Sequence, residues 1–243
     1  MSTPWPELSY EKGKPTYETL HMWTQVVGKI RVAQSPWWNH SWHVPLYLTP
    51  RGLTTSAIPH GERFFDLEFD FLDHVLHVRT SDGGVRQVRL EPRSVASFYA
   101  ELMNTLEELD VPVRIHETPN EVANPIPFSE DSVHATYDGD VAQGLWRALL
   151  QMDRVFKRFQ SGFLGKSSPV HFFWGSFDMA VTRFSGREAP IHPGGVPNLP
   201  DEVAQEAYSH EVSSAGFWPG GEPFPEPVFY SYAYPAPEGF SAA

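Results

Sequence analysis

A lysine, a histidine and a threonine occur twice in this chain with identical spacing, the second set lying 128 residues after the first: Lys29, His43 and Thr54, then Lys157, His171 and Thr182. Each set begins at the end of an apolar pattern with helical spacing and continues into strand-like segments. The spacing predicts an internal duplication, in which residues 16–116 and 138–240 are two related, pseudo-symmetric helix-plus-strands halves. We expect the halves to be fused into a single domain over residues 1–243, because no low-complexity linker separates them.

The first half shows a helical pattern, then strands, then a second helical pattern. Residues 16–34 have apolar side chains at helical spacing, and Pro36 ends that pattern. Residues 43–49 and 64–80 indicate strands, and the pair Asp82-Gly83 favours a tight hairpin turn. Ser94 is a suitable N-cap for the second helix.

The second half follows a proline-rich connection over residues 118–128. It begins with a long helical pattern, for which Asp138 or Asp140 can serve as the N-cap. The later elements are strands at 170–177, 179–184, 208–218 and 227–234, with a loop at 189–200 and a short helix at 201–207. Strands and helices do not alternate as in βαβ units, so the sequence predicts an α+β fold of antiparallel sheets with packed helices.

Composition narrows the classes of function. The chain of 243 residues has no cysteine, which excludes disulfides, zinc–thiolate sites and cysteine nucleophiles. A formal net charge of -12 argues against nucleic acid as a partner, because a protein that binds the phosphate backbone needs a basic surface. The sequence contains no long apolar run and no signal-peptide pattern at its start. We therefore expect a cytoplasmic protein that does not bind a membrane. Its oligomeric state stays open.

Several long motifs resemble those of one bacterial family. They are TLHMWTQVVGK at residues 19–29, NHSWHVPLY at 39–47, RGLTT at 51–55, PVHFFWGSFD at 169–178 and YSHEVSS at 208–214. Together they make the chain, from Trp5 to about Phe240, similar to the family catalogued as domain of unknown function 5996. The resemblance implies no reaction, cofactor or catalytic residue.

Histidines in the strand-like segments suggest a shared centre. His43, His171 and His210 can together bind zinc, iron or copper and leave a position open for substrate, or act in acid–base catalysis. Glu211 and Asp178 are the nearest candidate catalytic carboxylates. Adjacent strand residues point to opposite faces, so His210 and Glu211 can serve one metal only at a bulge or strand end. The alternative is that these histidines are buried packing residues.

Other residues indicate a ligand pocket. His21 and Lys29 share one helix face, which either turns into a pocket or is a solvated stripe. Trp42, Tyr47 and Trp174 belong to an aromatic group around the candidate histidines, and most such aromatics are expected in the core. Arg183 precedes a glycine- and proline-rich loop that we interpret as a lid or an ordered loop, and it is a further candidate ligand residue.

Two functions follow from these patterns. The first is an enzyme, an oxidoreductase or hydrolase, that acts on a small organic substrate at a histidine-rich centre where the halves meet. In that case His171→Gln would remove metal or ligand loading. The alternative is a non-catalytic protein that binds a small-molecule ligand in an aromatic-lined cavity. A serine hydrolase is disfavoured because the chain contains no GxSxG motif.

Overall fold

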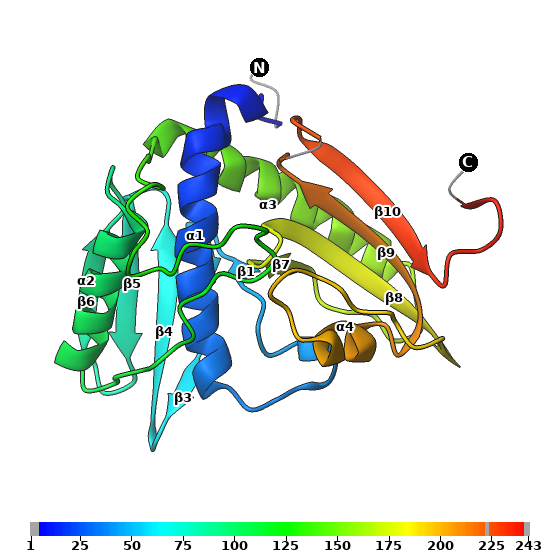
Figure 1. The fold of residues 1–243 in the computed structure, drawn as a ribbon, viewed down its shortest axis with the longest axis horizontal. Helices are drawn as coiled ribbons and strands as arrows, with labels where there is room; N and C mark the ends of the chain where they lie inside the picture. Colours follow the sequence, from blue (N-terminus) through cyan, green and yellow to red (C-terminus); the bar gives the residue numbers. More distant parts are fainter. Residues whose placement is uncertain (1–4, 222–223, 241–243) are drawn as a thin grey trace.

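Two antiparallel sheets of six and four strands, together with four α-helices, form an α+β fold in a computed structural model that describes residues 5–221 and 224–240 (Figure 1). This confirms the predicted fold class. Among the described residues, none of the helices has the length and apolar character that a membrane crossing requires.

The first sheet is a meander with one extra edge pairing. Its strands are ordered β1 (Tyr47–Leu48), β2 (Gly52–Thr54), β4 (Arg63–Asp70), β5 (Val75–Thr80) and β6 (Val85–Arg89), and β3 (Ile58–His60) pairs with β4. Phe65, Leu67 and Phe69 alternate along β4 with polar residues and are buried, as expected for a sheet with one face in the core.

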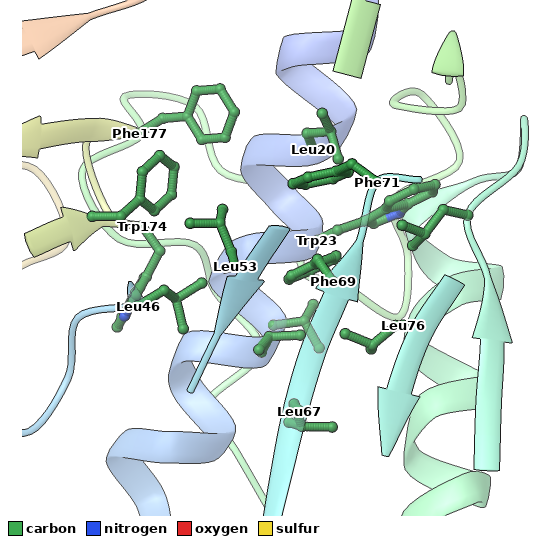
Figure 2. Close-up of a cluster of buried hydrophobic side chains, with 14 of the residues drawn as sticks. Leu20, Trp23, Leu46, Leu53, Leu67, Phe69, Phe71, Leu76, Trp174 and Phe177 are labelled. Carbon is green, nitrogen blue, oxygen red and sulfur yellow. The ribbon is translucent and has the colours of Figure 1, made fainter. Parts of the chain in front are cut away.

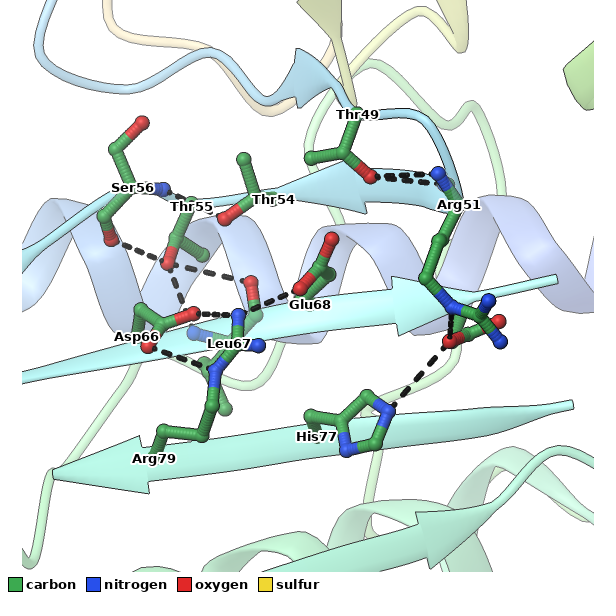
Figure 3. A network of polar contacts seen from close by, with 12 residues as sticks. Thr49, Arg51, Thr54, Thr55, Ser56, Asp66, Leu67, Glu68, His77 and Arg79 are labelled. Carbon is green, nitrogen blue, oxygen red and sulfur yellow. Dashed lines mark hydrogen bonds and ion pairs between the residues drawn. The ribbon is translucent and has the colours of Figure 1, made fainter. Parts of the chain in front are cut away.

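The outer face of the first sheet carries a network of charged residues (Figure 3). Arg79 on β5 lies between Asp66 and Glu68 on β4, with nitrogen–oxygen distances of 2.6 and 2.5 Å. Asp66 and Arg79 are direct partners in the strand register, so this is a cross-strand ion pair. Arg51 and His77 meet Asp70 on the same face. The arginines of this network reach the solvent, whereas Asp70 is buried beneath them.

Helix α1 (Tyr10–Gln34) lies at the junction of the two sheets (Figure 1). It begins after Ser9, whose side chain accepts a hydrogen bond from the Lys12 backbone, and therefore six residues before the predicted start. Trp23 stacks on Phe98 of α2 (Val95–Glu108), with ring centroids 4.7 Å apart. Figure 2 shows the apolar cluster continuing from Phe69 past α1 to Trp174. One core therefore spans both sheets.

The two faces of the second sheet have different neighbours, a long helix on one side and a short helix on the other. Its strand order is β10 (Val228–Tyr234), β9 (His210–Trp218), β8 (Asp178–Glu188) and β7 (His171–Phe173). Helix α3 (Gly139–Ser161) packs against β8 and β9, where it lies behind the sheet in Figure 1. Helix α4 (Asp201–Ala207), which has the predicted bounds, lies on the other side near the 3₁₀ turn η1 (Asn39–Ser41).

The two sheets meet at a short antiparallel bridge. Leu46 and Phe172 exchange two backbone hydrogen bonds of 3.0 Å each, which join the start of β1 to β7. The strand predicted at residues 43–49 begins only at Tyr47, because His40 and Ser41 adopt positive φ and place His43 in a turn. His171 is the first residue of β7. Superposition of the two halves stays a prediction.

Candidate functional site

A cavity of about 1200 Å³ lies over the face of the second sheet that is turned away from α3. Side chains alternate between the two faces of a strand, so residues two apart form its floor. The floor consists of Asp178, Ala180, Thr182 and Phe184 of β8, Val212 and Trp218 of β9, and Tyr230 and Tyr232 of β10. The surrounding walls come from α1, α4, residues 120–121 and residues 196–199.

Asp178 is the acidic group of this floor. It is 7% exposed, and it accepts hydrogen bonds from the Ser176 hydroxyl at 2.5 Å and from the Tyr230 hydroxyl. Burial raises the pKa of the Asp178 carboxyl, and these two hydrogen bonds partly oppose that effect. The cavity floor therefore contains a buried carboxyl group that is stabilised by two hydroxyl donors.

Gly216 makes room for the contact between Tyr230 and Asp178. Gly216 on β9 is the direct register partner of Tyr230 on β10. A Cβ atom on Gly216 would lie only 2.1 Å from Cζ of the Tyr230 ring. Because this position has no side chain, the ring can lie across β9 and reach the neighbouring strand β8.

Glu121 is a second carboxyl group beside Asp178. Its segment is held by reciprocal 2.8 Å hydrogen bonds between Gln25 and the Asn120 backbone, and by a 2.8 Å bond from the Glu121 N–H to the Pro197 carbonyl. Glu121 has a φ of 59°, in the left-handed region that non-glycine residues seldom occupy. Burial, and the charge of Asp178, raise the pKa of Glu121 to about 7.

His21 fixes the turn between β7 and β8. Its Nε2 group donates to the Gly175 carbonyl at 2.7 Å, and burial lowers the pKa of His21 to about 4. His21 is therefore neutral at physiological pH. A Cβ atom on Gly175 would lie 2.1 Å from Oε1 of Glu121, so this glycine permits the close approach of the Glu121 carboxyl to the turn.

Four of the predicted site residues line the cavity: Asp178, His21, Trp42 and Trp174. The other seven are described by the structure and lie outside the lining: His43, His171, His210, Glu211, Lys29, Tyr47 and Arg183.

The three candidate histidines lie in separate surroundings. His43 accepts a 3.2 Å hydrogen bond from the Trp38 backbone, and His210 lies beside the Ser209 hydroxyl. His171 is fully buried against Trp42, and neither ring nitrogen has a hydrogen-bond partner. Within residues 5–221 and 224–240, no group of three or more histidine and carboxylate residues is placed to hold a metal ion. The three histidines therefore do not form a metal-holding group in this structure, and a shared role in acid–base catalysis stays a prediction.

The remaining predicted residues have structural contacts. Glu211 pairs with Arg187 at 2.5 Å near the solvent. The guanidinium of Arg183 lies 3.4 Å from the ring centroid of Phe159 on α3, because odd-numbered residues of β8 face that helix. Tyr47 has the Arg31 guanidinium over its ring at 5.3 Å, and Lys29 is buried, which lowers its pKa to about 8.

Sequence analysis did not identify Glu121, Tyr230 or Ser176 as site residues. Glu121 lies in the proline-rich connection, where no periodic pattern assigns a direction to a side chain. Tyr230 is one of several tyrosines in its strand. The hydroxyl of Ser176 donates to Asp178, a contact that no sequence motif indicates.

The fold and this site define an α+β protein with a broad, mostly apolar cavity over one antiparallel sheet and a pair of carboxyl groups within it. The chain belongs to the family of unknown function DUF5996, whose family model matches residues 5–243. The resemblance noted from the motifs is thereby confirmed. No curated protein and no solved structure shows a significant match to the chain.

Proposed function

We propose that this protein binds a small organic molecule in the cavity over the second sheet. The observation that carries the proposal is the cavity itself, which has a volume of about 1200 Å³ and walls that are mostly apolar. Ligand sites commonly combine such walls with a few converging polar groups. Here Glu121, Asp178 and His21 are those groups, and they come from three different segments of the chain.

Acid–base catalysis on the bound molecule is the second candidate, and the carboxyl pair favours it. Glu121 has a pKa of about 7 and can both give and take a proton near neutral pH. Asp178 has a different environment, because two hydroxyl groups donate to it. Paired carboxyls with distinct environments are a frequent arrangement for an acid and a base. Catalysis through the three predicted histidines has no comparable support.

A pair of variants on α4 tests the binding proposal. Ala207 lines the cavity, whereas Glu202 on the same helix is exposed and outside the lining. Binding is measured as the fluorescence increase of N-phenyl-1-naphthylamine, a neutral apolar probe. We expect Ala207→Trp to fill part of the cavity and reduce probe binding, and Glu202→Trp to leave it unchanged. Equal binding by both variants and the parent protein would contradict the proposal.

A further inference from the structure

Three carboxyl groups line the cavity, and two of them, Glu121 and Asp178, have no cationic partner in the part of the chain that the structure describes. Among the ion pairs of the described residues, none involves Glu121 or Asp178. Lys14 also lines the cavity, but it is half exposed and lies 3.8 Å from Glu18 in an i,i+4 pair. His21 is neutral. His40 also lines the cavity, and Lys166 contacts it and lies over the rings of Trp42 and Phe184, but no cation is among the groups that shift the pKa of Glu121 or Asp178. The charge around the carboxyl pair is therefore negative or neutral, depending on the protonation of its two members.

Buried carboxylates are ordinarily paired with a cation or kept protonated, because burial without a partner is costly. An anionic ligand would meet the two carboxyls and gain no opposing charge. A ligand with a positive charge would instead supply the missing partner and could displace the proton that burial retains on Glu121. The carboxyl pair thus discriminates between ligands by the sign of their charge.

Aromatic rings in the cavity lining also favour a positively charged ligand. Phe173, Trp174 and Phe177 of the β7–β8 turn region line the cavity, as do Tyr230 and Tyr232 of β10. Burial raises the pKa of Tyr230, so its hydroxyl stays protonated and donates to Asp178. Ring faces carry negative potential and attract alkylammonium groups, whereas the apolar floor accepts a hydrocarbon chain.

We infer that the ligand is an amphiphilic amine, whose ammonium group lies between Glu121 and Asp178 and whose apolar part lies along the floor of the second sheet. The inference rests on the proposed function, and it adds the chemical class of the ligand. It explains why an apolar cavity contains Glu121 and Asp178, neither of which forms an ion pair with a basic residue of the described chain. It also gives a role to Gly175 and Gly216, which allow Glu121 and Tyr230 to approach the same end of the cavity.

Three probes with equal chain length test the inference: decylamine, 1-decanol and decanoate. Their affinities for the full-length protein are measured by isothermal titration calorimetry at one pH and ionic strength. We expect decylamine to bind about tenfold or more tightly than 1-decanol, as expected for a desolvated charge-assisted contact, and decanoate to bind most weakly. A decanoate affinity equal to or above that of decylamine would overturn the inference.

Variants that remove one negative charge test whether Glu121 and Asp178 cause the preference for decylamine over 1-decanol. Glu121→Gln and Asp178→Asn keep the side-chain volume, and we expect each to lower the ratio of decylamine to 1-decanol affinity while 1-decanol still binds. Glu18→Gln is the control, because it removes one negative charge at the exposed rim of the same cavity. If Glu18→Gln lowers the ratio as much as Glu121→Gln, the preference is a general surface effect and the inference fails. Glu121→Gln alone suffices if Asp178→Asn does not fold.

The probes separate the inference from the proposed function on which it rests. Binding of 1-decanol without a preference for decylamine would overturn the amine class and keep the cavity as a ligand site. Failure of all three probes, together with equal N-phenyl-1-naphthylamine binding by Ala207→Trp and the parent protein, would overturn both.

Discussion

Tyr230 on β10 donates a hydrogen bond to Asp178 on β8, across the full width of the intervening strand β9. The contact depends on Gly216, over which the Tyr230 ring lies. It joins the edge strand of the second sheet to the carboxyl pair, so the sheet's pairing order directly determines the chemistry of the cavity floor.

Substitution of Gly216 tests this arrangement. In Gly216→Ala the new Cβ would lie 2.1 Å from the Tyr230 ring, so the ring must move and release Asp178. We expect a loss of about 1 to 3 kcal/mol in the free energy of unfolding and weaker decylamine binding. Tyr230→Phe keeps the ring and removes only the hydroxyl, and its stability loss should be nearer about 1 kcal/mol. Urea denaturation of both variants measures the difference, and an unchanged Gly216→Ala protein would contradict the geometry.

Glu121 should make the folded protein less stable as the pH rises. Its folded pKa of about 7 lies above its ordinary value of 4.5, so the folded state binds the proton more tightly than the unfolded chain. The stability that this provides is complete below pH 4.5 and is lost as the pH rises through 7. The loss amounts to at most about 3.5 kcal/mol, at about 1.4 kcal/mol per pKa unit.

Glu121→Gln removes this titration, so the variant should gain stability relative to the parent protein between pH 4.5 and 7.5. The titration of His21 has the opposite effect on stability, which it increases as the pH rises over much of this range. Its lowered pKa of about 4 means that its stabilising contribution is present above pH 6.5 and is lost as the pH falls through 4. His21 is common to both proteins, so the difference between their urea unfolding free energies isolates Glu121. A difference that does not grow with pH would show that Glu121 ionises normally.

Replacement of Gly28 by alanine should destabilise the protein, although the same replacement usually stabilises a helix. Alanine is favoured over glycine inside a helix by about 1 kcal/mol. At Gly28 on α1, however, a Cβ would lie 2.3 Å from the Trp174 indole nitrogen, which donates to the Val44 carbonyl. We expect Gly28→Ala to lower the thermal midpoint. Gly144→Ala on α3 is the matched control, because nothing lies within 4 Å of its Cβ position, and it should raise the midpoint.

His171 should prove to be a packing residue. Both of its ring nitrogens are buried without a partner, and burial lowers its pKa to about 3. Since unsatisfied buried polar atoms are costly, we expect His171→Leu to change the free energy of unfolding by less than about 1 kcal/mol or to increase it. Decylamine binding should be unchanged in His171→Leu and in His171→Gln. Loss of probe or metal content in His171→Gln, with an unchanged midpoint, would restore the function predicted from the sequence.

Local patterns in the sequence predicted most of the secondary structure. Ser94 and Asp138 cap their helices as expected, and α4 has the predicted bounds, because caps and helical spacing act within a few residues. The segment around His43 was mispredicted as a strand. His40 and Ser41 adopt the left-handed backbone conformation there, and the sequence does not indicate this because neither residue is glycine.

The sequence by itself determined which chemical groups were available. Four of its candidate site residues, Asp178, His21, Trp42 and Trp174, line the cavity, and their role in binding or catalysis stays a prediction. Only the tertiary structure decided that Glu121 joins Asp178 there and that, among the described residues, His43, His171 and His210 form no group able to hold a metal ion. The reason is physical. Periodicity determines which face of its own strand or helix a side chain occupies. Which strands become neighbours, and where an aperiodic proline-rich segment crosses them, depends on packing between distant parts of the chain.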